Sequence, residues 1–471
     1  MILLPLLFLF TRGHMSNERQ LGWAIDAWAA SHRDELVRDV MELVRIPSVT
    51  GTAECAQAAD KLLEMAQRYQ FCTERDGDWS VSILHHGLKN TRELGILGHL
   101  DVVPAGAGWR YAPYEPIEKA GWIIGRGSSD NKGPVVMSLY VLRCLQEMGI
   151  ELNSTVRLIA GCREETDMQD VKHYLQIHQP PAYTLNCDGA WAGCIGEKGI
   201  LEADLLLPLA TDKLISFDGG TASNTVPDQA CAVLKVNDPD ELSALKALHS
   251  GLEMHGSRAT FRVSGKAAHC CMPARGDNAI IRLLHLLCDS GLVKELEHLK
   301  LCFPDCYGTG LRINHEDAVS GKTTCTATTA HLESGVLRVH INARTAVTQR
   351  FEWLMNALQK RLDKLGIGLE NVHWIPPRLD SPDQPQIKLL LETCQEFLDP
   401  KAKPYVMGGG THSRYFPHSL PYGPEVLDPR VKRPFGRAHE ADEAVCIDDL
   451  LRAIKVYVIA LKRLDEQLEH S

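Results

Sequence analysis

The sequence predicts an α/β protein with a mostly parallel sheet that is covered by helices and interrupted by a second lobe. Apolar residues recur at helical spacing over 34–44, 53–69, 133–148 and 167–176. Short apolar runs typical of buried strands lie at 80–85, 93–99, 155–160 and 183–186. Strands that alternate with helices indicate a parallel sheet with helices on both faces.

The region 193–385 follows a different pattern, which indicates a separate lobe. Strand-like stretches alternate there with longer helices, for example at 201–206, 259–263 and 336–341. Two lobes are also expected because 471 residues exceed the size of a single hydrophobic core. Helical patterns return at 386–398 and 447–464. The expected segments are an extension of unclear role at 1–15, a first domain in two parts at 16–192 and 386–471, and an inserted lobe at 193–385.

Composition and charge narrow the class of protein. The hydrophobic and charged fractions, 44% and 23%, are those of an ordinary globular protein. A net charge of −10 argues against a nucleic-acid partner and against a polybasic membrane anchor, so a small-molecule substrate is favoured. Fifteen cysteines without a CxxC pair indicate reduced thiols and a cytoplasmic location. We expect no catalytic role for the adjacent Cys270 and Cys271.

The first ten residues, MILLPLLFLF, form an apolar run without a basic start or a small-residue cleavage site. The run is also too short to span a bilayer. We therefore expect an extension ahead of a start at Met15 rather than a secretory signal, and no membrane partner.

Polar side chains follow three of the predicted strands at the point where each strand ends. His99 and Asp101 close one strand, Glu164 and Glu165 follow a second, and Asp188 follows a third. Ligands of open α/β sheets bind beyond the carboxyl ends of the strands. These residues, distant in sequence, are therefore expected to converge.

Two motifs supply the first candidates for a metal site. In GHLDVVP, His99 could bind a metal while Asp101 orients its ring, although a histidine in this position is equally often structural. In GRGSSDNKG, Asp130 lies in a glycine-rich loop before a helix. A phosphate-binding loop is the competing interpretation, but the Walker spacing and a Lys followed by Ser or Thr are absent.

Adjacent carboxylates in CREET provide the next candidates. Such a pair is usually a solvated turn, but in a metal site Glu165 could bind a cation while Glu164 accepts a proton from water. Asp188 in NCDG and His439 in GRAHEADE complete a set of two histidines and three carboxylates. Such ligands suit zinc, manganese or cobalt.

The ordered motifs HLDVVP, GRGSSDNKG, EET, CDG and GRAHEADE resemble those of the co-catalytic zinc peptidases, which include carboxypeptidase G2, aminoacylase and carnosinase. The resemblance covers nearly the whole chain after about residue 20, and GEKG and GGGT make it closest to the peptidase V-type dipeptidases. It implies a zinc-exopeptidase-like catalytic domain, an inserted α+β lid lobe, and two divalent ions, zinc in preference to manganese or cobalt.

The resemblance also implies a role for each residue of the metal site. Asp130 would bridge the two ions, and the bond between Asp130 and Asn131 would be cis. Glu164 would be the general base and Asp101 would orient His99. The expected ligands are His99 and Asp188 for one ion, Glu165 and His439 for the other, and Asp130 for both.

By the same resemblance, His269 in GKAAH stabilises the oxyanion of the scissile carbonyl. The implied substrate-binding residues are Asn224, Arg344, Gly409, Gly410 and Thr411. Arg344 has an independent rationale, because a planar guanidinium pairs bidentately with the carboxylate of a peptide. A single His, Asn or Arg in a strand-rich lobe more often has a structural role. Only the surrounding motifs favour a role in substrate binding or catalysis. His412, beside Thr411, is expected to affect selectivity.

We therefore expect a metal-dependent hydrolase of dipeptides with free amino and carboxyl ends. An N-acyl-amino-acid deacylase or a succinyl-diaminopimelate-type amidohydrolase would use the same metal site. A catalytically silent binding module is a third alternative, which the presence of Glu164 and the five ligands argues against. The inserted lobe is about twice the length implied by the carboxypeptidase-like relatives, which allows a monomer as well as a homodimer.

Overall fold

The computed structural model describes residues 17–89, 91–236, 238, 252–289, 291, 293–425 and 433–469. The chain forms two compact units. The first comprises the described residues up to Cys194, together with Ser381–Tyr405 and those from Thr411 onward. The second comprises Ile195–Asp380 and the short segment Val406–Gly410. The apolar run within 1–15 lies outside the described residues.

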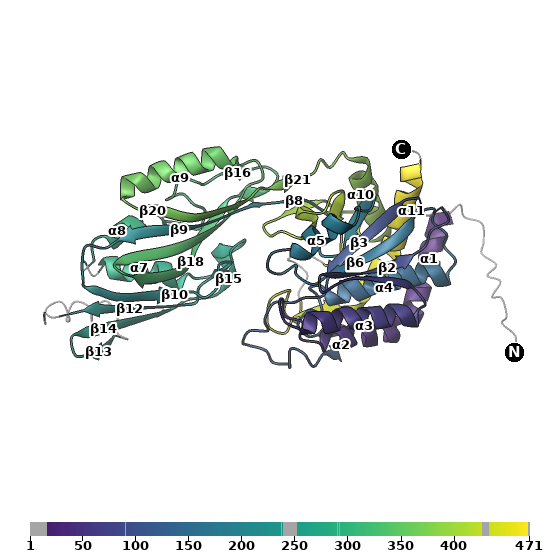
Figure 1. The fold of residues 1–471 in the computed structure, drawn as a ribbon, viewed down its shortest axis with the longest axis horizontal. Helices are drawn as coiled ribbons and strands as arrows, with labels where there is room; N and C mark the ends of the chain where they lie inside the picture. The colour runs from purple at the N-terminus through teal and green to yellow at the C-terminus, as the bar shows by residue number, and fades with distance from the viewer. Residues whose placement is uncertain are drawn as a thin grey trace. The chain divides into compact units, whose positions relative to one another are not determined.

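The first unit is built on a six-stranded sheet among its described residues, in the order β1-β2-β6-β3-β7-β23. Figure 1 labels β2, β6 and β3 of this sheet. The strands are β1 (Cys72–Asp76), β2 (Ser80–His85), β3 (Glu93–His99), β6 (Thr155–Gly161), β7 (Tyr183–Asn186) and β23 (Ser419–Pro421). β6, β3, β7 and β23 pair in parallel, whereas β1 and β2 pair antiparallel at one edge. The predicted α/β class is confirmed, and the antiparallel edge is an addition to it.

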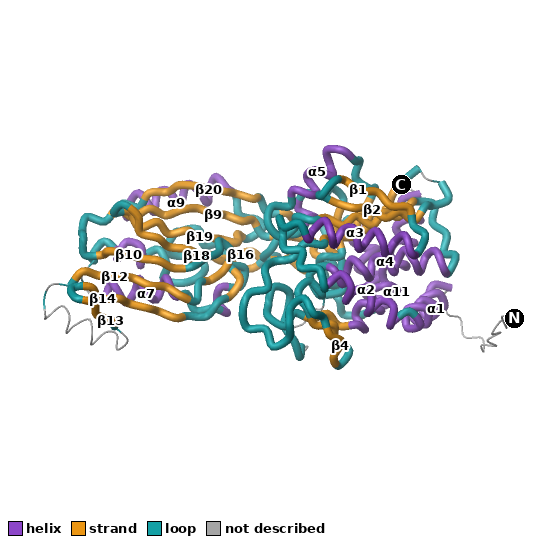
Figure 2. Tube along the Cα trace, turned by 60° about the horizontal axis from the view of Figure 1, so that its bottom comes forward, coloured by secondary structure: helices purple, strands orange, loops and turns teal. Residues whose placement is uncertain are grey.

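Helices cover both faces of this sheet. They are α1 (Asn17–Ser31), α2 (Arg33–Val44), α3 (Glu54–Arg68), α4 (Lys132–Glu147), α5 (Gln169–Ile177), α10 (Pro385–Phe397) and α11 (Ile447–Glu469). α4 contacts β3 and β6, and α2 and α11 lie against α4 (Figure 2). On the other face, Leu97 and Ile159 pack with Val171 and Tyr174 of α5. The alternation of side chains along β3 and β6 thus supplies an apolar surface to both layers.

The second unit contains an eight-stranded sheet among its described residues, in the order β13-β14-β12-β10-β18-β19-β9-β20. The strands are β9 (Gly199–Pro208), β10 (Leu214–Gly219), β12 (Gln229–Lys235), β13 (Glu253–His255), β14 (Arg258–Ser264), β18 (Thr324–Glu333), β19 (Val336–Thr345) and β20 (Gly368–Ile375). Every pair in it is antiparallel. Its core packs against α7 (Ala279–Asp289), α8 (Leu296–Lys300) and α9 (Phe351–Leu365).

Burial alternates along the strands of this second sheet. In β12, Ala230, Ala232 and Leu234 are buried, while the residues between them are half-buried. The face away from the core carries ion pairs such as Arg338 with Asp204 at 2.8 Å. Such a pattern is typical of an antiparallel sheet with one face on the core and one face toward water.

The remaining elements of the described residues are short strands and 3-10 helices. In the first unit these are β4 (Ile117–Lys119), β5 (Trp122–Ile124), β24 (Ala444–Cys446) and the 3-10 helix η2 (His412–Arg414). The others are β8 (Cys194–Glu197), β11 (Thr225–Val226), β15 (Ala268–His269), η1 (Pro273–Arg275), β16 (Glu316–Asp317), β17 (Gly321–Lys322), β21 (Arg378–Leu379) and β22 (Tyr405–Met407). No helix among the described residues is both long and apolar enough to cross a membrane. All fifteen cysteines are free thiols.

Candidate metal centre

The parallel strands of the first unit bring the predicted site residues to one edge of the sheet. β3 ends at His99, and β6 ends at Gly161, three residues before Glu164. β7 ends at Asn186, whose side-chain Oδ1 accepts a hydrogen bond from the backbone N–H of Asp188 at 3.0 Å. Convergence at the carboxyl ends of the strands, predicted from the sequence, is therefore present in the fold.

Five side chains form two groups that could each hold a metal ion, and the groups share Asp130. One group contains His99, Asp130 and Asp188, and the other contains Asp130, Glu165 and His439. In each group the potential ligand atoms lie within 4.8 Å of one another. Nε2 of His99 lies 2.9 Å from Oδ1 of Asp130, and Nε2 of His439 lies 3.2 Å from Oδ2. The two oxygens of Asp130 thus face different histidines.

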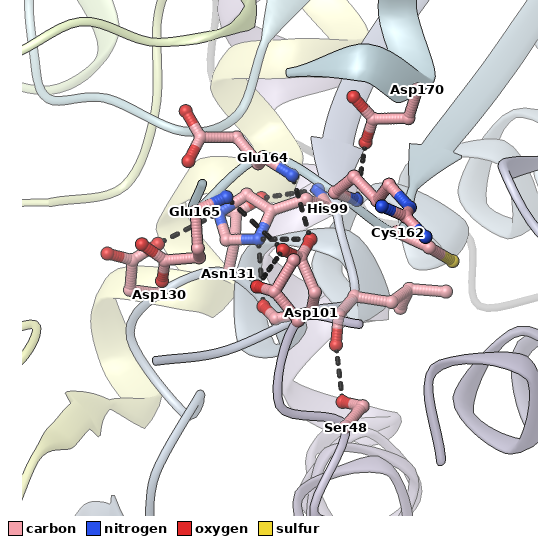
Figure 3. A network of polar contacts seen from close by, with 12 residues as sticks. Ser48, His99, Asp101, Asp130, Asn131, Cys162, Glu164, Glu165 and Asp170 are labelled. Atoms are coloured by element: carbon pink, nitrogen blue, oxygen red, sulfur yellow. Dashed lines mark hydrogen bonds and ion pairs between the residues drawn. The ribbon is translucent and has the colours of Figure 1, made fainter. Parts of the chain in front are cut away.

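Asp101 connects His99 to the loop that carries the two glutamates (Figure 3). Nδ1 of His99 lies 2.9 Å from the carbonyl oxygen of Asp101 and 3.5 Å from its carboxylate. The carboxylate accepts the N–H of Glu164 at 3.1 Å and that of Glu165 at 3.2 Å. Thr50 donates a further hydrogen bond to it at 2.6 Å. Burial alone raises the pKa of Asp101, but the contacts with His99 and Thr50 hold it below its ordinary value.

Glu164 and Glu165 differ in their surroundings. Glu165 lies 3.0 Å from Nε2 of His439. Glu164 is 7% exposed, and its Oε1 is buried without a hydrogen-bond partner among the described residues. Burial, followed by the nearby carboxylates, raises the pKa of Glu164 well above its ordinary value. Glu165 is thus placed where it could bind a cation, and Glu164 has a carboxylate oxygen, free among the described residues, that could accept a proton.

The cluster concentrates negative charge in a partly buried place, where only His99 of the five side chains is fully buried. Burial and the charge of Asp130 raise the pKa of Asp188 to about 8. Burial alone lowers the pKa of His439, but Glu165 and Asp130 raise it to about 12. Two imidazoles and three carboxylates are the donors that zinc, manganese and cobalt accept. The donor set and the unpartnered oxygen of Glu164 fit two divalent cations.

A buried ion pair that the sequence analysis missed fixes the backbone of this site. Oε1 of Glu443 accepts the N–H groups of Ser129 at 2.9 Å and Asp130 at 3.0 Å. Its Oε2 lies 2.5 Å from Nη1 of Arg126. Nη2 of Arg126 donates to the carbonyl oxygen of His439 at 3.3 Å. His439 has a φ of +66°, a left-handed conformation that costs a non-glycine residue about 1–2 kcal/mol.

Both partners of this pair lie within motifs that were quoted for other reasons, Arg126 in GRGSSDNKG and Glu443 in GRAHEADE. The only sequence signal for this pair was therefore that one motif contains an arginine and the other a glutamate. The bond between Asp130 and Asn131 is cis, as expected, and the bond between Trp191 and Ala192 is also cis.

His412 corrects one expectation. Its side chain is fully buried, and its Nε2 bonds Oδ1 of Asp170 at 3.0 Å. Its ring meets the ring of His99 edge-on at 6.1 Å between centroids. His412 therefore packs behind His99, and the expected effect on selectivity has no support in this position.

The residues predicted to contact substrate lie mainly in the second unit. The N–H of Cys270, next to His269, donates to the carbonyl oxygen of Asn224 at 3.0 Å. Arg344 is 6% exposed and donates to Oδ1 of Asn342 at 2.9 Å and to the carbonyl oxygen of Gly408 at 3.4 Å. Gly409 and Gly410 follow Gly408 in this unit.

Thr411 belongs to the first unit, where its side chain is buried. Its hydroxyl accepts the N–H of Ser413 at 3.2 Å and a hydrogen bond from Asn186 at 3.2 Å. A cavity of about 240 Å³ in the same unit is lined by Asp130 and Asp188, together with Trp122, Glu425 and Arg433.

An α/β sheet whose strand ends carry two three-ligand groups around a shared carboxylate defines a metal-dependent hydrolase. Residues 95–463 match the model of peptidase family M20/M25/M40. The chain therefore belongs to this family and is a metallopeptidase, which confirms the resemblance seen in its motifs.

A relative from Bacillus subtilis (strain 168), named "Putative dipeptidase YtjP", is 30% identical over 94% of this chain and 100% of its own. The solved structure of the dipeptidase Dug1p from Saccharomyces cerevisiae has a TM-score of 0.59 at 13% identity and covers 96% of this chain and 99% of its own. A tripeptidase from Staphylococcus aureus has a TM-score of 0.58 at 16% identity and covers 92% of this chain and 99% of its own. These structures support the fold alone.

Proposed function

We propose that this metallopeptidase holds two zinc ions and cleaves dipeptides that have free amino and carboxyl ends. The observation that carries the proposal is the position of Asp130, whose two oxygens face His99 and His439 separately. In the proposed centre Asp130 would hold both ions. His99 and Asp188 complete the ligands of one ion, and Glu165 and His439 complete those of the other.

Two bound cations would lower the pKa of the attacking water and polarise the substrate carbonyl. Glu164 takes one proton from that water while the water oxygen bonds to the carbonyl carbon. Glu164 then gives the proton to the leaving nitrogen as the C–N bond breaks, which returns the glutamate to its starting state. The buried, unpartnered Oε1 of Glu164 supports this role. Asp101 is the positioning residue for His99 and for the backbone of Glu164.

Residues of the second unit would recognise the substrate. His269 would donate a hydrogen bond to the oxyanion that forms on the carbonyl. Arg344 would pair with the free carboxylate, and Asn224 with the peptide backbone. Gly409 and Gly410 would supply backbone donors. For Thr411 the proposed contact is also made by the backbone, because its hydroxyl is buried.

The preference for dipeptides is supported by the Bacillus subtilis relative, which is named as a putative dipeptidase. The fold does not set peptide length, because a dipeptidase and a tripeptidase both share it. The N-acyl-amino-acid deacylase remains the alternative. The fifteen free thiols support a location in the reducing cytoplasm.

The test uses the full chain after chelation and reloading with zinc, manganese or cobalt. A panel would compare one dipeptide with its N-acetyl form, its amide and the corresponding tripeptide. We expect the free dipeptide to be the best substrate and zinc to restore the highest activity at two ions per chain. Faster cleavage of the N-acetyl form would establish the deacylase instead, and equal cleavage of the tripeptide would remove the length preference.

A further inference from the structure

A tight turn in the second unit folds Cys271 back onto the ring of His269. The N–H of Met272 donates to the carbonyl oxygen of His269 at 2.9 Å, which closes the turn. Sγ of Cys271 then lies 2.9 Å from Nδ1 of His269. The backbone N–H of Cys271 points at the same nitrogen at 3.2 Å.

These two contacts determine which ring nitrogen of His269 carries the proton. A backbone N–H can only donate, so its contact at 3.2 Å favours the tautomer in which Nδ1 offers its lone pair but does not by itself exclude the other tautomer. The thiol lies closer to the same lone pair, and by donating its S–H it adds the second contact that selects this tautomer. A neutral imidazole with an accepting Nδ1 carries its proton on Nε2.

We propose that Cys271 is a positioning residue that holds His269 as the Nε2–H tautomer, so that Nε2 presents a hydrogen-bond donor to the oxyanion. The inference rests on the proposed role of His269 in peptide hydrolysis. In the other tautomer Nε2 would present a lone pair, which repels a developing negative charge. Cys271 thus gains a role that the sequence analysis did not assign to it.

The surroundings of the turn show why its geometry is fixed. β15 pairs with β11, where His269 is opposite Thr225. The carbonyl oxygen of Cys270 accepts a hydrogen bond from Thr324 at 3.0 Å. The ring and the thiol are therefore attached to a backbone that is held from two sides.

Cys271 also lies against the segment that Arg344 contacts. A Cβ added at Gly408 would lie 2.6 Å from Cβ of Cys271, so only glycine fits there without a shift. The carbonyl oxygen of Gly408 accepts the hydrogen bond from Nη1 of Arg344. A side chain larger than cysteine at position 271 would therefore disturb both His269 and Arg344, and the test needs small replacements.

The first measurement is the tautomer itself, on the full chain loaded with zinc and labelled with ¹⁵N-histidine. Long-range proton–nitrogen spectra distinguish a protonated ring nitrogen from an unprotonated one, and a His269→Gln spectrum assigns the signals. We expect Nδ1 of His269 to be unprotonated and Nε2 to be protonated. A protonated Nδ1 in the wild type would overturn the proposal.

The second measurement compares Cys271→Ala, which removes the thiol donor, with Cys271→Ser, which keeps a donor of similar size. One hydrogen bond corresponds to about a fivefold change, so we expect Cys271→Ala to lower kcat about fivefold with KM within twofold. Its His269 signals should report partial protonation of Nδ1. Cys271→Ser should restore both kcat and the single tautomer. Cys231→Ala, a cysteine on β12 of the same unit, is the matched control and should match the wild type.

The remaining outcomes would each overturn the proposal. If the His269 signals of Cys271→Ala match those of the wild type, the proposal is overturned whatever the kcat of the variant. The thiol would then act by packing or not at all. Failure of serine to restore the tautomer would do the same. A wild type that does not cleave dipeptides would instead refute the proposed function, and the spectrum of His269 would still settle the tautomer.

Discussion

The candidate residues of the two units are held in place in different ways. In the first unit, ionisable side chains contact one another directly, as His99 and His439 do with Asp130. In the second unit, the contacts described above for His269 and Arg344 are with uncharged groups, the thiol and backbone N–H of Cys271 for His269 and the Asn342 side chain and Gly408 carbonyl for Arg344. The first arrangement concentrates charge for cations, and the second orients a few donors. This difference indicates that substitutions in the first unit should affect metal content and kcat, whereas those in the second should leave the metal content unchanged and affect substrate binding or oxyanion stabilisation.

The largest expected effect is that of Glu164→Ala. Removing the proton acceptor should lower kcat by about 10³-fold or more, because general bases contribute roughly 10²–10⁴-fold. Metal content, measured by plasma emission, should stay near two ions per chain. Glu165→Ala is the matched control and should lower the metal content toward one ion per chain, because Glu165 contacts His439. A drop to one ion in Glu164→Ala would reverse the roles of the two glutamates.

Glu443→Gln should weaken the centre without touching a ligand. It leaves Arg126 without its buried partner, so we expect a loss of about 3 kcal/mol in the free energy of unfolding. Metal affinity, measured by competition with a chelator, should fall about tenfold to hundredfold, as is usual when groups that orient ligands are changed. Unchanged affinity would show that the charge of Glu443 is not needed to position Asp130.

Two controls separate stability from positioning. Glu440 is an exposed neighbour that accepts the N–H of Arg437. Glu440→Gln should change neither the free energy of unfolding nor the metal affinity. Replacing Arg126 and Glu443 together by methionine removes both buried charges and should restore stability. Metal affinity should remain low in that double variant, because the N–H groups of Ser129 and Asp130 still lack their acceptor.

Arg344→Lys tests recognition in the second unit. Lysine keeps the charge but loses the planar fork, so KM for a dipeptide should rise about tenfold to thirtyfold with little change in kcat. An amidated dipeptide should show a similar loss with the wild type. Because both changes delete one interaction, the two losses should not multiply. Arg338→Lys on the same strand is the control, since Arg338 contacts Asp204 and Glu370 instead.

The smallest expected effect is that of Thr50→Val. It removes one hydrogen bond to Asp101, so kcat should fall about threefold to tenfold with two ions retained. The control is Thr52→Val, because Thr52 is exposed. A wild-type kcat in Thr50→Val would show that Asp101 needs no support beyond His99 and the loop of Glu164.

Much of the first unit could be predicted from sequence. The predicted strand at 93–99 coincides with β3, and the predicted helix at 447–464 lies within α11. These elements have strong apolar periodicity, and the ligands follow strand ends. The patterns did not predict α1 or β1. In β1 all the side chains are exposed or half-buried, so no apolar alternation marks the strand.

The contacts that support the site were harder to predict. Arg126 and Glu443 are 317 positions apart, and a single sequence carries no sign that they pair. His412 and Asp170 are 242 positions apart, and only the fold shows that this histidine is buried behind His99. The contact of Cys271 with His269 is local but depends on the closing of one turn. Residue types indicate chemistry, whereas partners and tautomers depend on three-dimensional neighbours.

The order of the ligands along the chain has a consequence for synthesis on the ribosome. His99, Asp130 and Asp188 all precede the second unit, so one complete set of three ligands exists before that unit is made. The other set must wait for His439, which is 274 positions from Glu165. Closing the longer loop costs about 2 kcal/mol more than closing the 31 positions between His99 and Asp130. A nascent chain can therefore present one metal-binding set early, and the second set is completed only after the second unit has been synthesised.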